Sequence, residues 1–242
     1  MIQPGTLPRP SLRDQIRETL LSRIGQGKLA PGDRIVEAAL GTEFGVSSIP
    51  VREAIRELVA MGVLEFANHK GAWVRQVSLA ETIEALEVKS ILEGLAGRLA
   101  APRLRGKCRH LHRCCAAILA ASRKGDLVAY QNHNQVFHRT IIEASGNKVL
   151  LKTWNTLAFE VRTRPILQFL AKQSPVAIAR EHQQIADALD AGHGARARIL
   201  LALHSDKLVE HLRREMASPS NGNEEVPVLV SKRTRTPSRK KT

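Results

Sequence analysis

Four side chains in the second half of the chain have the types and spacing of a metal site. Asn134 and His138 are four residues apart, so they lie on one face of a helix and can chelate together. His182 falls in a later helix, and His204 follows 22 residues after it, a separation that two antiparallel helices can bring together. Three neutral imidazoles and one amide oxygen suit a borderline divalent ion, so the pattern predicts a Zn²⁺ or Ni²⁺ site. The alternative is that these histidines are surface residues or core residues with satisfied nitrogens.

Such a metal would keep open coordination positions inside a helical cavity, where a small organic acid could bind through its carboxylate. Basic side chains would then be needed nearby, and Arg162 and Arg164 are candidates for effector binding. The alternative is that both arginines are surface or ion-paired residues.

A second group of residues, near position 50, has the pattern of a DNA-reading helix. Ser48, Arg52 and Arg56 recur at four-residue intervals and share one helix face. A helix fits the major groove, and residues near its N-terminus reach base edges or phosphates. Arg52 can make a bidentate contact to guanine or hold a phosphate. The alternative is that Arg52 and Arg56 are solvated charges paired with Glu53 and Glu57.

The elements around this group predict a winged helix-turn-helix. We expect helices over 12–25, 37–44 and 47–61, the last with Ser47 as its cap and Pro50 in its first turn. Two short strands, 63–66 and 72–75, flank a loop that contains His69, Lys70 and Gly71, which is typical of a hairpin. The tip of this hairpin could reach the minor groove or the DNA backbone.

The rest of the chain predicts an all-helical bundle of six to seven helices, so the fold class is mainly α. Bundles of this kind hold ligand or metal sites on facing helices in their core. Breaks at Pro102, Gly125, 146–147, 174–175 and 192–194 separate the helices, and Pro165 should kink or interrupt one of them. The expected helices are 79–101, 103–123, 126–145, 148–170, 176–191 and 195–217.

The head resembles the DNA-binding domain of GntR-family transcription regulators. The matching residues include the stretches Gly45-Val46-Ser47 and Pro50-Val51-Arg52-Glu53-Ala54, followed by Gly62 and Gly71. The resemblance implies that Ser47, Ser48, Ile49, Arg52, Arg56, His69, Lys70 and Gly71 face DNA. The family usually carries Arg where Ser48 stands, Thr at Ile49 and often a basic residue at Ala38, so the operator sequence cannot be transferred.

The body resembles the FCD (FadR C-terminal) ligand-binding domain over roughly residues 79–215. The matching residues are the Asn134-x3-His138 pair, Ser145-Gly146-Asn147, Glu181-His182 and His204. In metal-binding members of that family an Asp/Asn-x3-His pair joins two later histidines. Asn134 supplies less charge than the Asp of many relatives. Family members often have Arg at the position of Lys89, which makes Lys89 a third candidate for effector binding, although it lacks the Arg fork.

These observations predict a ligand-responsive transcription regulator, not an enzyme. It would bind a pseudo-palindromic operator in double-stranded DNA as a homodimer, because one winged module contacts few bases. An effector in the body would release or reorient the heads, with the junction at 75–80 as the natural hinge. From family habit we expect a repressor. Two alternatives remain: a metal-free regulator whose histidines contact the effector, and a metal-dependent enzyme that activates water at His138, His182 and His204.

Composition agrees with this domain plan. The 242 residues carry a formal net charge of +14, which points to a polyanionic partner, and only 3% are aromatic, which favours helix over sheet. No apolar run approaches the length of a membrane span, the N-terminus has no signal sequence, and three cysteines argue against a disulfide scaffold. We therefore expect a bacterial cytoplasmic, nucleoid-associated protein. The predicted parts are a flexible arm (1–11), the head (12–76), the body (77–216) and a disordered basic tail (217–242) that attracts nucleic acid or is only a solvated tail.

Overall fold

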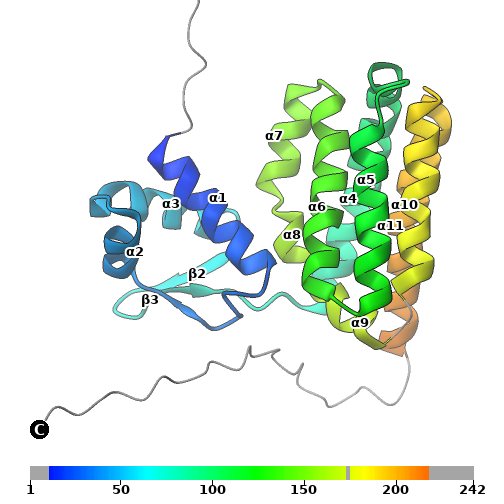
Figure 1. Cartoon of the computed structure of the whole chain (residues 1–242). Coiled ribbons are helices and arrows are strands. Elements are labelled where there is room, and N and C mark those ends of the chain that lie inside the picture. Colours follow the sequence, from blue (N-terminus) through cyan, green and yellow to red (C-terminus); the bar gives the residue numbers. More distant parts are fainter. Residues whose placement is uncertain (1–10, 173–174, 218–242) are drawn as a thin grey trace, which may run out of the picture.

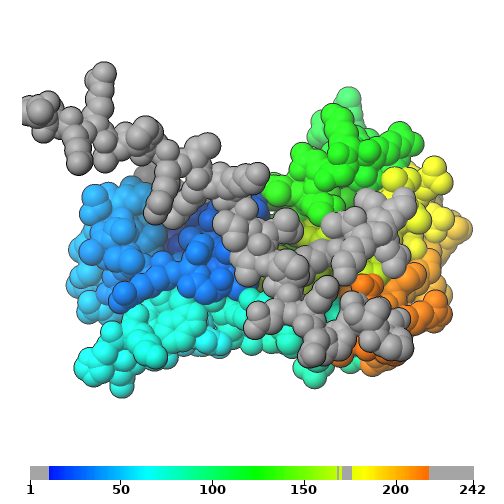
Figure 2. Space-filling view, turned by 90° about the horizontal axis from the view of Figure 1, so that it is seen from below, coloured from blue at the N-terminus to red at the C-terminus, as the bar shows by residue number. Residues whose placement is uncertain are grey.

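The computed structural model describes residues 11–172 and 175–217. These residues form two lobes side by side, a head of helices and a small sheet and a body of helices (Figures 1 and 2). The mainly α fold class predicted from the sequence is confirmed. The predicted arm and tail lie outside the described residues except for Ser11 and Ala217.

The head has the predicted order of three helices followed by a hairpin. Ser11 caps the first helix, because its Oγ accepts a hydrogen bond from the Asp14 amide at 3.1 Å. Gly45, with φ of +64°, ends the second helix in the left-handed conformation that favours glycine. The elements are α1 (Leu12–Gly25), β1 (Arg34–Ile35), α2 (Glu37–Phe44), α3 (Ser48–Ala60), β2 (Leu64–Ala67) and β3 (Gly71–Val74).

Strand β1 was not predicted from the sequence. It pairs antiparallel with β3, with Arg34 opposite Trp73 and Ile35 opposite Ala72, so the sheet has the order β1-β3-β2. Two residues are too few to show the alternation that identifies a strand, and β1 exists only through its pairing with β3. Strand β1 therefore anchors the base of the hairpin to the head.

The core of the head explains why α3 is held in place. Ile16, Leu20 and Ile24 of α1 are buried, as are Val51 and Leu58 of α3. Each such side chain contributes about 1.5–3 kcal/mol when it leaves water. The burial of one face of α3 leaves its other face exposed to solvent.

The described residues of the body form eight helices, more than the predicted six to seven. Their N-termini include side-chain caps from Ser78, Asp126 and Asn147. The helices are α4 (Leu79–Leu104), α5 (Arg109–Lys124), α6 (Leu127–Ala144), α7 (Lys148–Thr156), α8 (Phe159–Arg162), α9 (Ile166–Lys172), α10 (Pro175–Asp190) and α11 (Gly194–Ala217).

Two predicted helix boundaries were wrong. The break expected at Pro102 does not occur, because α4 continues to Leu104 with Pro102 inside its last turn. The helix expected over 148–170 is divided into α7, α8 and α9. Pro165 accounts for the second interruption only. At the first, Ala158 has a φ of +43°, and no glycine or proline marks the place.

Helices α4 and α11 pack closely against each other. A Cβ atom added at Gly97 of α4 would lie 2.4 Å from Leu201 Cδ1 and 3.2 Å from the Ala197 carbonyl oxygen of α11. The glycine is therefore needed for this close approach, which places His204 of α11 beside α4. Among the described helices, none combines the length and apolar character that a bilayer span requires.

Candidate metal centre and DNA-binding face

The predicted histidines meet inside the body. His138 of α6, His182 of α10 and His204 of α11 are buried, and one nitrogen of each lies within 4.8 Å of the other two. Asn134, one turn before His138 on α6, places Oδ1 2.7 Å from His182 Nε2. The structure thus brings together all four residues that the spacing selected.

Each histidine has an oxygen atom beside its Nδ1. His204 Nδ1 lies 2.9 Å from Glu181 Oε2, and His182 Nδ1 lies 3.2 Å from the Ile178 carbonyl oxygen. His138 Nδ1 lies 2.9 Å from Glu93 Oε1, close enough for an ion pair but without the geometry of a hydrogen bond. An oxygen at Nδ1 fixes the ring and the tautomer, so that Nε2 is the atom left for a metal.

Burial keeps the imidazoles of His138 and His182 neutral. It lowers the pKa of His138 to about 4, partly offset by Glu93, and it lowers the pKa of His182 well below its usual range. A neutral imidazole is the form that binds metal. Burial would raise the pKa of Glu93, yet its contacts with His138 and Lys89 lower it to about 2, so Glu93 is a carboxylate.

Lys89 lies at the same site and is paired there. Its Nζ donates a hydrogen bond to Glu93 Oε2 at 2.6 Å, and both side chains are buried. Lys89, Asn134, His138 and His204 line a cavity of about 30 Å³. That volume is enough for a metal ion or one water molecule.

The other two predicted effector residues lie elsewhere. Arg162 and Arg164 are absent from the cavity lining and lie at the junction with the head. Arg162 donates to the Met61 carbonyl oxygen of the head at 2.8 Å, and the Arg164 guanidinium approaches Gly27. For Arg162 the alternative prediction, that it is an ion-paired residue, is correct, because Glu81 lies 3.4 Å from its Nε. Thr163, between them, does line the cavity.

The predicted DNA-reading residues are exposed on α3. Arg52 has 52% of its side chain exposed, Ile49 is 65% exposed, and Ser48 and Arg56 are also exposed. Ser47 holds the N-cap position but makes no capping hydrogen bond with its side chain. Arg52 is paired with Glu37 of α2 at 3.1 Å, whereas Glu57 pairs with Arg17 of α1. The alternative prediction, that Arg52 pairs with Glu53 or Glu57, is therefore wrong.

The hairpin tip contributes the remaining predicted residues. His69 and Lys70 are exposed, and His69 adopts a φ of +67° in the turn. Gly71 follows with a φ of +80°, where other residues would be strained. Figure 1 shows α2, α3 and this turn on the side of the head that faces away from the body. That side is free of the body and can approach a duplex.

Comparisons with known proteins identify the family of each domain. Residues 12–74 match the family of bacterial regulatory proteins named gntR, and residues 84–207 match the FCD domain. A "Probable D-xylose utilization operon transcriptional repressor" of Paenarthrobacter nicotinovorans is 36% identical over 199 residues, which are 82% of this chain and 87% of the relative. The chain belongs to the GntR family, with an FCD domain as its body.

Other members support this assignment. The regulator McbR of Escherichia coli K12 is 30% identical over 182 residues, 74% of this chain and 81% of the relative. A solved structure of E. coli McbR/YncC covers 85% of this chain and 99% of its own, with a TM-score of 0.72 and 25% identity. This GntR-family chain is accordingly a ligand-responsive, DNA-binding transcription regulator, and its FCD body is the effector-binding domain.

Two residues at the histidine cluster were not predicted from the sequence as part of the site, although Glu181 is among those that match the FCD domain. Glu93 and Glu181 hold the Nδ1 sides of His138 and His204, which lie 45 and 23 residues further along the chain. A signal for Glu93 was its position four residues after Lys89, on the same helix face. The signal for Glu181 was only its place next to His182, which gives no indication that it serves His204.

Proposed function

We propose that this GntR-family regulator is a homodimeric repressor whose body binds one divalent metal ion, Zn²⁺ or Ni²⁺, and a small organic acid. Asn134, His138, His182 and His204 would hold the ion. The carboxylate of the acid would complete its coordination, and occupancy would alter the affinity of the two heads for their operator. The alternative is a metal-free regulator in which the three histidines contact the effector directly.

The donor set carries this proposal. His138 Nε2 is buried and has no hydrogen-bond partner among the described residues, a costly state for a polar atom. His182 faces two oxygens, Ile178 O and Asn134 Oδ1, yet a neutral imidazole has one N–H to donate. A cation bound by Asn134 Oδ1 and the three Nε2 atoms would satisfy His138 and remove the competition at His182.

The charges at the cavity favour an anionic effector. Lys89 and Glu93 balance each other, and the imidazoles of His138 and His182 are neutral, so a bound divalent ion leaves the site positive. A carboxylate is the small organic group that neutralises such a site.

A second copy of the chain is the partner that two-fold DNA sites require. Four exposed apolar side chains lie on α4 and α11, the two helices that pack against each other: Val88, Ile91, Ile199 and Leu203. Large exposed apolar side chains on neighbouring helices favour burial in an interface. We therefore place the dimer contact on this pair of helices.

Metal analysis of the purified full chain tests the proposal. Protein stripped with a chelator and then dialysed against Zn²⁺ or Ni²⁺ should retain one ion per chain. His204→Ala should abolish retention, whereas His193→Ala, which changes an exposed histidine outside the site, should not. Wild-type protein that takes up neither ion would favour the metal-free alternative.

Operator binding tests the repressor part. DNA selected from a random pool by the wild-type protein provides a ligand without knowledge of the regulated genes. Sedimentation should show two chains per duplex, and Zn²⁺ together with a small carboxylate such as citrate should change the affinity for that DNA. One chain per selected duplex would contradict the homodimer.

A further inference from the structure

Helix α8 belongs to both lobes at once. Val161 of α8 and Ala158, the residue just before α8, are buried in the hydrophobic cluster of the head, together with residues of α1 and α3. Phe159, between them, is buried in the cluster of the body. Figure 1 shows α7 and α8 on the side of the body that faces the head. A displacement of α8 therefore disturbs packing on both sides of the junction.

The residues after α8 form part of the cavity wall. Thr163 and Ile166 line the cavity that holds Asn134, His138 and His204. Thr163 Oγ1 donates to the Phe159 carbonyl oxygen at 2.7 Å, which ties this wall to the first residue of α8. The cavity and α8 are thus adjacent in sequence as well as in space.

Arg162 links the same segment to the end of α3. Its Nη2 donates to the Met61 carbonyl oxygen at 2.8 Å, and its Nη1 donates to the Leu157 carbonyl oxygen at 2.6 Å. Met61 is the residue that ends α3. A cation at the C-terminal end of a helix is favoured by the helix dipole and satisfies a carbonyl that lacks an intrahelical partner.

A second arginine completes this contact. Arg75, just after β3, donates from Nε to the Gly62 carbonyl oxygen at 2.6 Å and pairs with Glu81 of α4. Glu81 also lies 3.4 Å from Arg162 Nε. The predicted hinge at 75–80 is therefore bound to α8, and both arginines hold the turn that follows α3.

The wall formed by 163–166 is the one most able to move when the cavity fills. A volume of about 30 Å³ cannot hold an organic acid, which has several times the size of one water molecule. Most of the other lining residues belong to the long helices α4, α6 and α11. Thr163 and Ile166 instead join helices of four and seven residues, next to Ala158 with its left-handed φ of +43°.

We propose that residues 158–166 connect the effector cavity to the DNA-reading helix, with Arg162 as the positioning residue that passes a change of cavity occupancy to the Met61–Gly62 end of α3. The inference rests on the proposed function, because occupancy of that cavity is its starting event. It assigns to Arg162 a part in regulation, in place of the direct effector contact predicted from the sequence.

Hydrogen–deuterium exchange of the full chain tests this connection. The amides of Met61, Gly62 and Val63 are hydrogen-bonded to the last turn of α3, so their exchange reports the opening of that end. Adding Zn²⁺ with citrate to the wild type should change exchange at least twofold at both 59–63 and 158–166. In Arg162→Ala the change at 158–166 should remain, and the change at 59–63 should disappear. Arg162→Lys, which keeps the charge but lacks the fork, should show a reduced change at 59–63.

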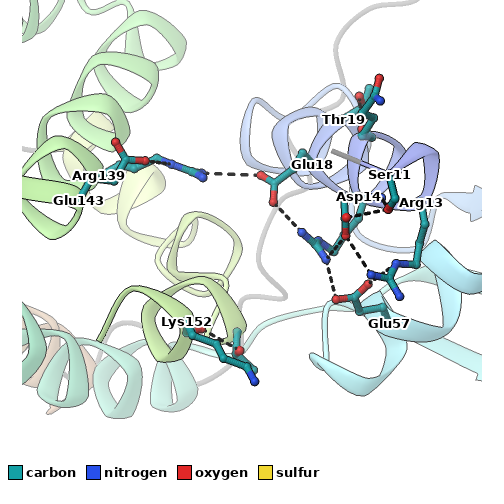
Figure 3. A network of polar contacts seen from close by, with 12 residues as sticks. Ser11, Arg13, Asp14, Glu18, Thr19, Glu57, Arg139, Glu143 and Lys152 are labelled. Atoms are coloured by element: carbon teal, nitrogen blue, oxygen red, sulfur yellow. Dashed lines mark hydrogen bonds and ion pairs between the residues drawn. The ribbon is translucent and has the colours of Figure 1, made fainter. Parts of the chain in front are cut away.

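The matched control is Arg139→Ala. Arg139 of α6 also joins the lobes: it pairs with Glu18 of α1 at 3.7 Å and with Glu143 of its own helix (Figure 3). This variant should respond like the wild type. If Zn²⁺ and citrate change exchange at 59–63 equally in wild type and Arg162→Ala, the connection through Arg162 is overturned.

A second arm needs no ligand, so it separates this inference from the metal proposal. Thr163→Phe places a larger side chain at the cavity wall. Thr163→Val is the control, because valine has nearly the size of the natural threonine. The Phe variant should alter exchange at 59–63 at least twofold, and Arg162→Ala in the same chain should cancel the effect. Circular dichroism establishes that the variants are folded. Absence of zinc uptake would overturn the metal site alone, whereas a folded Thr163→Phe protein with unaltered exchange at 59–63 would overturn the connection.

Discussion

His182 Nε2 and Asn134 Oδ1 lie 2.7 Å apart, the one pair of predicted metal ligands in direct polar contact. Asn134 comes from α6 and His182 from α10, so the contact fixes the relative position of two helices around the site. Asn134 is also the predicted ligand whose charge can be changed without altering its size, because aspartate has the same shape as asparagine.

Asn134→Asp should therefore strengthen metal binding. A carboxylate adds a negative charge next to a divalent ion, and we expect at least about a tenfold lower Kd for Zn²⁺, which corresponds to about 1.4 kcal/mol. Isothermal titration of chelator-stripped protein measures the change. Gln135→Glu, which adds the same charge one residue away, is the control and should leave the Kd within twofold. Equal affinity in wild type and Asn134→Asp would remove Asn134 from the site.

Glu181→Gln should weaken metal binding through His204. The Glu181 carboxylate orients His204 Nδ1 at 2.9 Å and also accepts from Lys207 at 2.6 Å. Loss of such an outer partner typically lowers metal affinity about 10–100-fold. Glu210→Gln, an exposed change on α11, is the control. A Kd for Zn²⁺ that is the same in both variants would show that Glu181 does not support the ligand.

Local signals explain why the head could be predicted from sequence and part of the body could not. Gly45, Ser47 and Pro50 set the turn and the start of α3 within six residues, and the structure places both there. Ala158 carries no such signal, since alanine does not favour the left-handed backbone that it adopts at this buried position. The interruption at Ala158 was for that reason not predicted, whereas the one at Pro165 was.

The same distinction applies to the candidate metal centre. The i, i+4 spacing of Asn134 and His138 is a property of one helix and is visible in the sequence. The carboxylate partners of His138 and His204 come from other helices, Glu93 from α4 and Glu181 from α10. Arg162 was predicted to bind an anionic effector because it is an arginine. In the structure its guanidinium instead donates to backbone carbonyl oxygens at the junction.

Deletion of residues 218–242 should reduce the salt dependence of non-specific DNA binding. The deleted segment has six Lys or Arg and two Glu, and each phosphate contact contributes about −0.9 to the slope of log K against log salt. Fluorescence anisotropy with unrelated duplex DNA at several salt concentrations measures the slope. Preference for the selected operator over unrelated DNA should stay the same. An unaltered slope would mean that the tail takes no part in DNA binding.

Glu160→Gln should stabilise the protein at neutral pH. Glu160 of α8 is buried at the junction, and burial raises its pKa above the ordinary value, against the weaker pull of Arg139 and Arg162. A carboxyl with a raised pKa in the folded state contributes stability below its unfolded pKa and loses it as the pH rises through the folded value. Wild type should thus lose stability relative to Glu160→Gln between about pH 4.5 and neutrality.

Thermal unfolding at several pH values measures this difference. The Tm of Glu160→Gln should exceed that of wild type at pH 7, and the gap should narrow toward pH 4.5. Glu143→Gln, at an exposed position on α6, should follow the wild type. A gap that widens as the pH falls would mean that Glu160 is stabilised as a carboxylate in the folded protein.

Arg52→Ala should weaken operator binding by about 1–3 kcal/mol if the residue contacts a base. Arg52 is half exposed and held near Glu37, so it can turn to DNA at the cost of a surface ion pair worth less than about 1 kcal/mol. Gel-shift titration at fixed salt with the selected operator measures the loss. Arg123→Ala, which removes an equal charge from an exposed site on α5, corrects for the general effect of charge. Because Arg52 lies on the face of α3 opposite its buried residues, an affinity equal to that of Arg123→Ala would show that this face does not read the operator.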